Sequence, residues 1–291
     1  MTAAATDAML DTPPAPPGPW RRLLRNRTAI FAILVLVALV VLALAAPYLT
    51  NAQPLRISPG IRLKPPRPQN WFGTDHLGRD MFAMVLFGGR TSLLVGLLVS
   101  SISMSVAIVL GLAAGFYRRV DVVLMRLVDG LMAFPSIVLA TAAAGYLGPS
   151  VTTVIVALSI VLVAPVLRVV RGQILVLREL PMIEAARAVG VPDRRILARY
   201  LLPAIMSPLL VQASFIFSAA VLGEAALSFV GLGVGARDVS WGSALAEARN
   251  YIQNAWWIVV FPGAALVLTI LSLNLLGDAL RDSLDPRLAR R

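Results

Sequence analysis

Long apolar stretches alternate with short polar ones along most of the chain. A helix needs roughly 20 mostly apolar residues to cross a bilayer. The stretches that satisfy this, in chain order, are residues 28–49, 91–117, 124–147, 150–167, 204–223 and 257–277. Because a helix satisfies its own backbone hydrogen bonds in lipid, the pattern predicts an all-α polytopic membrane protein with six transmembrane helices.

The polar stretches define the organisation of the chain. Residues 1–27 are rich in Ala and Pro, end in arginines and show no hydrophobic period, so we predict a disordered basic tail. Residues 50–90 form a long loop after the first span. Residues 91–291 form a core of five spans, which an arginine-rich segment at 168–203 interrupts.

The segment 168–203 contains signals for a short helix. Pro181 suits a first helical turn, good helix formers follow it, and Gly190 suits the helix end. Pro192 and Asp193 then open a second element. The segment is therefore predicted to be a helical module at one membrane face. It is either a docking surface for another protein or an amphipathic loop that lies on the membrane.

Composition and charge agree with a membrane protein. Hydrophobic residues make up 58% of the chain and charged residues 14%, and the net charge is +11. Basic chains can bind nucleic acid, but these charges are divided among short loops beside the spans, which favours roles in orientation and headgroup attraction. Eighteen of the 26 basic residues fall on the side of both termini and of the segment 168–203. That side is predicted to be cytoplasmic.

The N-terminus also resembles a secretory signal peptide. Residues 21–27 are basic, and Ala43-Leu44-Ala45 resembles a cleavage site. However, the apolar run at 28–46 is longer than the 7–15 residues of a signal peptide. We therefore predict an uncleaved first span.

Several kinds of chemistry are excluded by the sequence. The chain has no cysteine and one histidine, His76, so disulfides, thiolate sites and multi-histidine metal sites are impossible, and we place His76 in a loop. A P-loop ATPase needs G-x-x-x-x-G-K-[ST], but the only lysine, Lys64, precedes Pro65. Secondary carriers usually hold ionisable residues in mid-membrane, whereas Asp129 and Glu224 are predicted near span ends. Energy for transport would come from a partner.

The segment 168–203 resembles the EAA signature of ABC-importer permeases. The matching residues are Glu184, Ala185, Ala186 and Arg187, then Gly190, and then Leu202 and Pro203. Tyr200 departs from the family pattern, which has Ile there. In that family the signature forms a coupling helix in a groove of the ATPase subunit, so the resemblance implies an ATPase-coupling role for these seven residues.

Further motifs resemble peptide permeases of the DppC/OppC type, from about Trp20 to the C-terminus. They are FGTDHLGRD from Phe72, MRLVDGLMAFP from Met125, EAALSFVGLG from Glu224, Trp241-Gly242 and Asp285-Pro286-Arg287. The resemblance implies a type I ABC-importer permease fold in a bacterial inner or plasma membrane, with both termini cytoplasmic. It also implies four kinds of partner: a second permease, two ATPase domains on one chain or two, an extracytoplasmic binding protein, and the bilayer. ATP and Mg²⁺ would bind the ATPase partners, and no cofactor is expected on this chain.

The outer loops, 50–90 and 234–256, are predicted to contact the binding protein. The candidate residues are Asp75, Arg79, Asp80 and Trp241. The alternative is that GTDHLGRD is a turn and a helix start that hold the second span in place.

The spans hold three candidates for the translocation path and one packing motif. Ser214 and Ser218 share a face of the fifth span, and Pro135 would kink the third. The alternative for the serines is that they are satisfied on the helix surface. Gly111 and Gly115 form a small-xxx-small pattern, which lets helices approach closely.

The predicted function is therefore a non-enzymatic permease subunit of an ATP-driven dipeptide or oligopeptide importer. The chain would form half of the translocation pathway and couple to a separate ATPase through the helix at 184–190. A nickel importer permease of the same fold is the first alternative. A membrane scaffold that transports nothing and a secondary carrier are the others.

Overall fold

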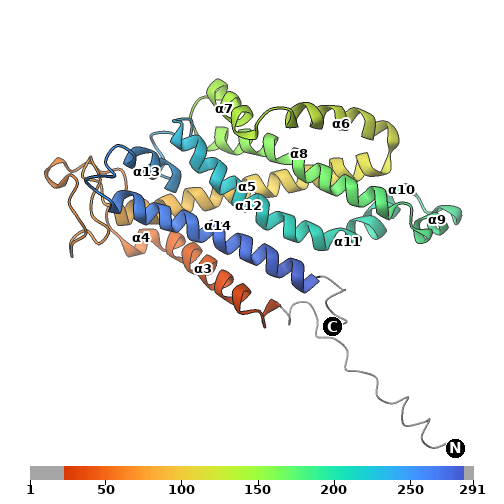
Figure 1. The fold of residues 1–291 in the computed structure, drawn as a ribbon, viewed down its shortest axis with the longest axis horizontal. Helices are drawn as coiled ribbons and strands as arrows, with labels where there is room; N and C mark the ends of the chain where they lie inside the picture. The colour runs from red at the N-terminus through yellow and green to blue at the C-terminus, as the bar shows by residue number, and fades with distance from the viewer. Residues whose placement is uncertain (1–22, 285–291) are drawn as a thin grey trace, which may run out of the picture.

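The computed structural model describes residues 23–284, which form a bundle of long helices (Figure 1). Five helices are long and apolar enough to cross a membrane: α3 (Arg27–Leu44), α5 (Met81–Phe116), α8 (Val151–Leu177), α12 (Met206–Phe229) and α14 (Trp257–Leu284). They correspond to five of the six predicted spans. Many large apolar side chains on these helices are exposed, as expected for surfaces that face lipid or partner subunits.

The third predicted span, 124–147, has the predicted kink at Pro135, and the kink is a complete break between two helices. The chain forms α6 (Arg118–Met132) and α7 (Ser136–Leu147), which are bent by 88° at the break. Pro135 lies in this break, where its missing N–H and its ring prevent a continuous helix. Because α5 and α8 run in the same direction (Figure 1), α6 and α7 together carry the chain back and supply a broken sixth crossing.

Helices α5 and α8 pack closely through the predicted small-residue motif. A Cβ atom added to Gly111 would lie 2.7 Å from the Val170 side chain, and one added to Gly115 would lie 2.6 Å from Ile174. Glycine is therefore needed at both positions for this close approach, which confirms the prediction from the Gly111 and Gly115 spacing.

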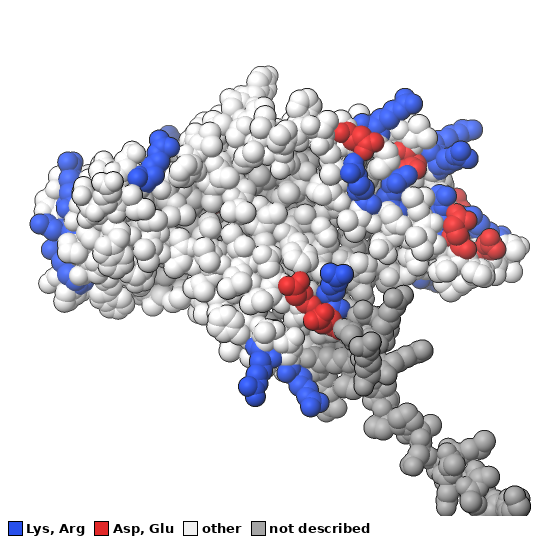
Figure 2. Space-filling model, viewed as in Figure 1, with Lys and Arg blue, Asp and Glu red and all other residues white. Residues whose placement is uncertain are grey.

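Short elements gather at the two ends of the bundle. The α9 end carries α9 (Pro181–Ala188), α10 (Asp193–Ile196), the π-type turn η2 (Leu197–Leu201) and α11 (Leu202–Ala204). The α13 end carries α4 (Ala46–Leu49), η1 (Pro59–Ile61) and α13 (Trp241–Ala248). The start of α3 and the end of α14 both lie toward the α9 end (Figure 1). Most of the charged side chains visible in Figure 2 also lie there. The predicted disordered tail, apart from its last five residues, and Asp285-Pro286-Arg287 fall outside the described residues.

Candidate functional sites at the two ends of the bundle

Helix α9 has well-defined ends. Pro181 occupies its first turn, where a missing N–H removes no helical hydrogen bond. At the other end Gly190 has a φ of +80°, a conformation that glycine adopts without strain. The Gly190 N–H donates to the Arg187 carbonyl at 2.9 Å, and the Val191 N–H donates to the Ala186 carbonyl at 3.0 Å. These two bonds form a Schellman cap, so the helix ends at the glycine predicted from the sequence.

One face of α9 is anchored in the bundle. Ile183 and Ala186 are buried in the cluster that also contains Phe116 and Ile196. The Arg187 guanidinium lies 4.9 Å from the centre of the Phe116 ring, a cation–π contact between α9 and the end of α5. Helix α9 is therefore fixed to the bundle by packing as well as by the chain.

The opposite face of α9 is exposed. Glu184 and Ala185 lie on the surface, and large apolar side chains flank them, with Met182 54% and Val189 79% exposed. Glu184 also sits in the first turn, where a carboxylate complements the helix dipole. A rigid helix with a small-residue, partly apolar outer face is suited to contact with another protein.

Arginines on α8 connect this end of the bundle to α5 and α6. Arg171 forms two hydrogen bonds with the Asp121 carboxylate, one of them 2.8 Å long, and Arg168 pairs with Asp129 at 2.7 Å. Arg178 donates to the Gly115 carbonyl at 2.9 Å. These pairings could not be predicted from the sequence, because the partners lie 39 to 63 residues apart in the chain.

The second half of the signature leads from α9 into α12. Leu202 is half-buried and Pro203 is exposed in the short helix α11. Tyr200, the departure from the family pattern, is partly buried in η2 and packs against the main core cluster. The structure thus places Leu202 and Pro203 at the junction with α12, away from the exposed face of α9.

At the α13 end, Asp75 and Arg79 are buried rather than exposed. The Asp75 carboxylate accepts hydrogen bonds at 2.8 Å from the N–H groups of Leu77 and Arg79, and it pairs with the Arg79 side chain. Arg79 also pairs with Glu247 on α13. The motif GTDHLGRD therefore closes a turn and joins the 50–80 loop to α13.

Asp80 and Trp241 also have structural partners. Asp80 caps α5 by accepting from the Ala83 N–H at 2.9 Å, and it accepts from the Asn70 amide at 2.6 Å. Trp241 is buried, and its indole N–H donates to the Val85 carbonyl at 2.9 Å. Of the four candidates for contact with a binding protein, Asp75, Arg79 and Trp241 are buried and Asp80 is half-buried, so none is exposed in this structure.

His76 lies in the loop, as predicted, and stacks on Tyr251 with ring centres 4.8 Å apart. Burial lowers its pKa below the usual value, and the charges of Arg79 and Arg62 act in the same direction against the opposing effect of Asp75. Ligand atoms of Asp75, His76 and Glu247 come within 4.8 Å of one another. Because Arg79 bonds both carboxylates, a positive charge already lies between them.

Glu224 is fully buried near the α13 end of α12 and connects three helices. Its carboxyl accepts hydrogen bonds from Ser240 at 2.6 Å, from Ser228 at 2.7 Å and from Ser92 on α5 at 3.1 Å. Ser240 is also the N-cap of α13, where it takes part in a capping box with Ser243. The sequence placed Glu224 near a span end but gave no sign of its partners, which come from separate parts of the chain.

The three candidates for the translocation path differ in exposure. Ser214 donates to the Val211 carbonyl at 2.8 Å, and Ser218 donates to the Ser214 carbonyl at 3.1 Å, so both serines are buried and bonded within α12. Ser214 also faces Gly277 of α14 closely. Pro135 is exposed at the break between α6 and α7.

Family models match most of the chain. Residues 107–290 match the model described as "binding-protein-dependent transport system inner membrane component". Residues 19–66 match the "N-terminal TM domain of oligopeptide transport permease C". The second match covers the first span and much of the loop that follows it.

Relatives match over nine tenths or more of the chain. The dipeptide transport system permease protein DppC of Alkalihalophilus pseudofirmus is 39% identical, over 99% of each chain. The glutathione transport system permease protein GsiD of Pectobacterium atrosepticum is 40% identical, over 92% of this chain and 90% of the relative. Among solved structures, the inward-facing MetNI methionine ABC transporter gives a TM-score of 0.58 at 19% identity, over 70% of this chain and 98% of that one. The last likeness concerns the fold alone.

Proposed function

Because the chain belongs to the family of binding-protein-dependent transport system inner membrane components, we propose that it is a permease subunit of an ATP-driven peptide importer. Relatives named for dipeptide and glutathione transport favour a peptide cargo over nickel, and over a scaffold that transports nothing. The match to the N-terminal domain of oligopeptide permease C supports the same choice.

In this proposal the chain forms half of the pathway and a second, homologous permease forms the other half. Two ATPase domains, on one chain or two, bind ATP and Mg²⁺ at the α9 end, and a binding protein delivers cargo at the α13 end. The α9 end faces the cytoplasm of a bacterial inner or plasma membrane. The excess of basic residues on that side, 18 of 26, supports this orientation.

The two faces of α9 support a role in coupling, because the inner face is anchored in the bundle and the outer face is exposed. Ile183 and Ala186 hold the helix to the bundle, while Glu184 and Ala185 are open to a partner. Because α9 follows α8 directly and leads through α10, η2 and α11 into α12, a displacement of α9 by the ATPase moves both long helices.

The test uses the complete complex in nanodiscs, with ATPase activity measured at increasing amounts of peptide-loaded binding protein. Glu184→Lys reverses the exposed charge on α9 and is expected to abolish the stimulation. Gly190→Pro is expected to do the same, because proline cannot adopt the φ of +80° found there. Asp278→Lys is the matched control, an exposed charge reversal on α14 near the same end.

Two results would contradict the proposal. Normal stimulation of Glu184→Lys and Gly190→Pro would show that α9 does not couple to the ATPase. Stimulation by a nickel-loaded protein, with none by a peptide-loaded one, would keep the fold and replace the cargo.

A further inference from the structure

The loop before α5 is strongly basic. Residues 50–74 contain four basic side chains, Arg56, Arg62, Lys64 and Arg67, and no Asp or Glu. Figure 2 shows basic and no acidic side chains over this end of the visible face. In the proposed orientation these charges lie outside the cell, contrary to the usual excess of basic residues inside. Membrane orientation therefore does not account for them.

The neighbouring acidic groups do not neutralise this loop. Asp75 and Glu247 pair with Arg79, and Asp80 caps α5 and bonds Asn70. Within residues 23–284, the ion pairs include none of Arg56, Arg62 and Lys64. The loop thus presents exposed positive charge that is not balanced within the described part of the chain.

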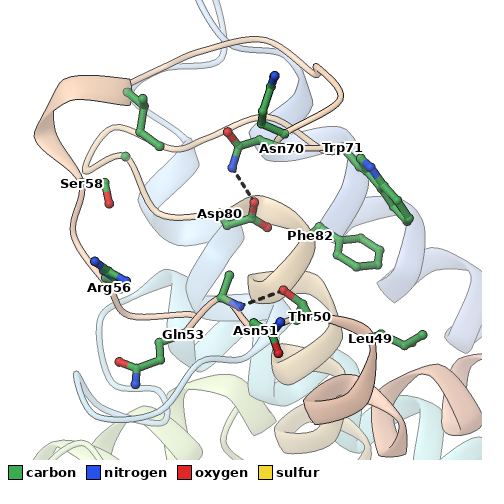
Figure 3. A pocket seen from close by; sticks show the side chains of 14 residues that line it. Leu49, Thr50, Asn51, Gln53, Arg56, Ser58, Asn70, Trp71, Asp80 and Phe82 are labelled. Carbon is green, nitrogen blue, oxygen red and sulfur yellow. Dashed lines mark hydrogen bonds between the residues drawn. The ribbon is translucent and has the colours of Figure 1, made fainter.

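A pocket of about 390 Å³ opens in the same loop (Figure 3). Arg56 and Ser58 lie on one side of it, and Trp71 and Phe82 lie on the other. The Asp80 carboxylate also lines the pocket between them, where it accepts from the Asn70 amide and the Ala83 N–H. Trp71 is 65% exposed, and its ring centre is 5.2 Å from that of Phe82. Exposed Trp and Arg side chains around a concavity are the residues that most often dominate the binding energy of protein interfaces.

We propose that residues 50–74 are the landing surface for an acidic face of the extracytoplasmic binding protein. One carboxylate of that protein enters the pocket beside Arg56, and apolar atoms next to it pack on Trp71. The inference rests on the proposed function, because it supposes delivery by a binding protein. It names residues other than the buried Asp75, Arg79 and Trp241, and it fixes the sign of the partner's charge as negative.

A protein partner fits the pocket better than a lipid headgroup does. Side-chain amides and hydroxyls, including Asn51, Gln53 and Gln69, contribute much of the lining. Such groups are suited to the backbone and polar side chains of a protein loop. The loop also extends past the ends of the long helices (Figure 1), beyond the apolar helix surface that acyl chains would need.

The experiment measures association of the binding protein with the nanodisc complex by surface plasmon resonance at low and high salt. The binding protein is the one that stimulates the ATPase of the native complex. The variants are the triple change Arg56→Glu, Arg62→Glu, Lys64→Glu, and the single change Trp71→Ala. Arg118→Glu, an exposed reversal near the α9 end, is the control.

The triple variant is expected to associate roughly tenfold more slowly or worse at low salt, with a weaker salt dependence, because electrostatic steering is lost. Trp71→Ala is expected to speed dissociation by about tenfold with little change in association. ATPase activity without binding protein should match the native complex in both variants.

If the triple variant binds the binding protein with the native association rate and the native salt dependence, the inference is wrong. The ATPase stimulation of the native complex, measured on the same preparation, tests the importer function separately. If the defect appears with phosphatidylglycerol nanodiscs and vanishes with purely zwitterionic ones, the loop binds lipid headgroups and the inference is wrong. Failure of every peptide-loaded protein to stimulate the native complex would instead refute the proposed function.

Discussion

Replacing Glu224 with Ala should weaken the docking of α13 on the bundle. The side chain is fully buried and accepts hydrogen bonds from Ser240, Ser228 and Ser92 at 2.6, 2.7 and 3.1 Å. Ser228 and Ser92 lie inside helices and can turn to a backbone carbonyl of the preceding turn when the carboxyl is removed. Ser240 precedes its helix and has no such carbonyl, so it bears most of the loss.

The magnitude follows from these three bonds. A buried hydroxyl without a partner costs about 1–3 kcal/mol, and removal of the buried side-chain carbons of Glu224 adds about 1 kcal/mol. We therefore expect the docking of α13 to weaken by about 2–4 kcal/mol. Glu224→Gln should have a smaller effect, because its amide oxygen still accepts while its NH₂ group opposes a donating hydroxyl.

The assay exploits the absence of cysteine from the chain. A single Ala244→Cys change places a thiol on the buried face of α13, where a water-soluble maleimide reacts only when the helix opens. A weakening of about 2–4 kcal/mol raises the labelling rate roughly 30- to 700-fold. Thr269→Ala removes a buried hydroxyl that bonds only its own helix and serves as control. Labelling of Glu224→Ala within twofold of the parent would refute the reasoning.

Two further variants test packing and protonation. Gly115→Ala puts a methyl group 2.6 Å from Ile174 and should lower the free energy of unfolding by about 1–3 kcal/mol. In the control Gly145→Ala the methyl group meets nothing within 4 Å, so this change should be neutral or stabilising. Thermal unfolding followed by tryptophan fluorescence measures both, and equal shifts of the two melting temperatures would contradict the reasoning. Burial lowers the pKa of His76 from 6.5, so the folded state favours the neutral ring. The contribution of His76 to the free energy of unfolding is therefore complete above about pH 6.5, and it falls as the pH drops toward the folded-state pKa. His76→Phe keeps the stack on Tyr251 and should flatten melting temperature between pH 7 and 5; an unchanged pH profile would exclude His76 as the cause.

Elements with a strong local signal could be predicted from the sequence. Five spans followed from charge-free apolar runs, and α9 followed from Pro181 and Gly190. The kink of the third span followed from Pro135, but average hydropathy registers neither its 88° angle nor the polar face of residues 118–132.

Pairings across the fold could not be predicted in this way. The i, i+4 spacing of Asp75 and Arg79 was a local signal for an internal pair, but Glu247 lies 168 residues from Arg79. The serines around Glu224 likewise come from different segments, up to 132 residues away. Such partners are set by how the helices pack, and a single sequence contains no direct record of that packing.

The close contact between α5 and α8 has a mechanical consequence. It lies toward one end of α8, since Val170 and Ile174 meet the glycines of α5 there. From Val170 the helix extends about 10 Å to Leu177 beside α9 and about 29 Å back to Val151. If α8 turns as a rigid body about its contact with Gly111 and Gly115, it acts as a lever with unequal arms. A movement of about 1 Å at the α9 end then becomes roughly 3 Å at the other.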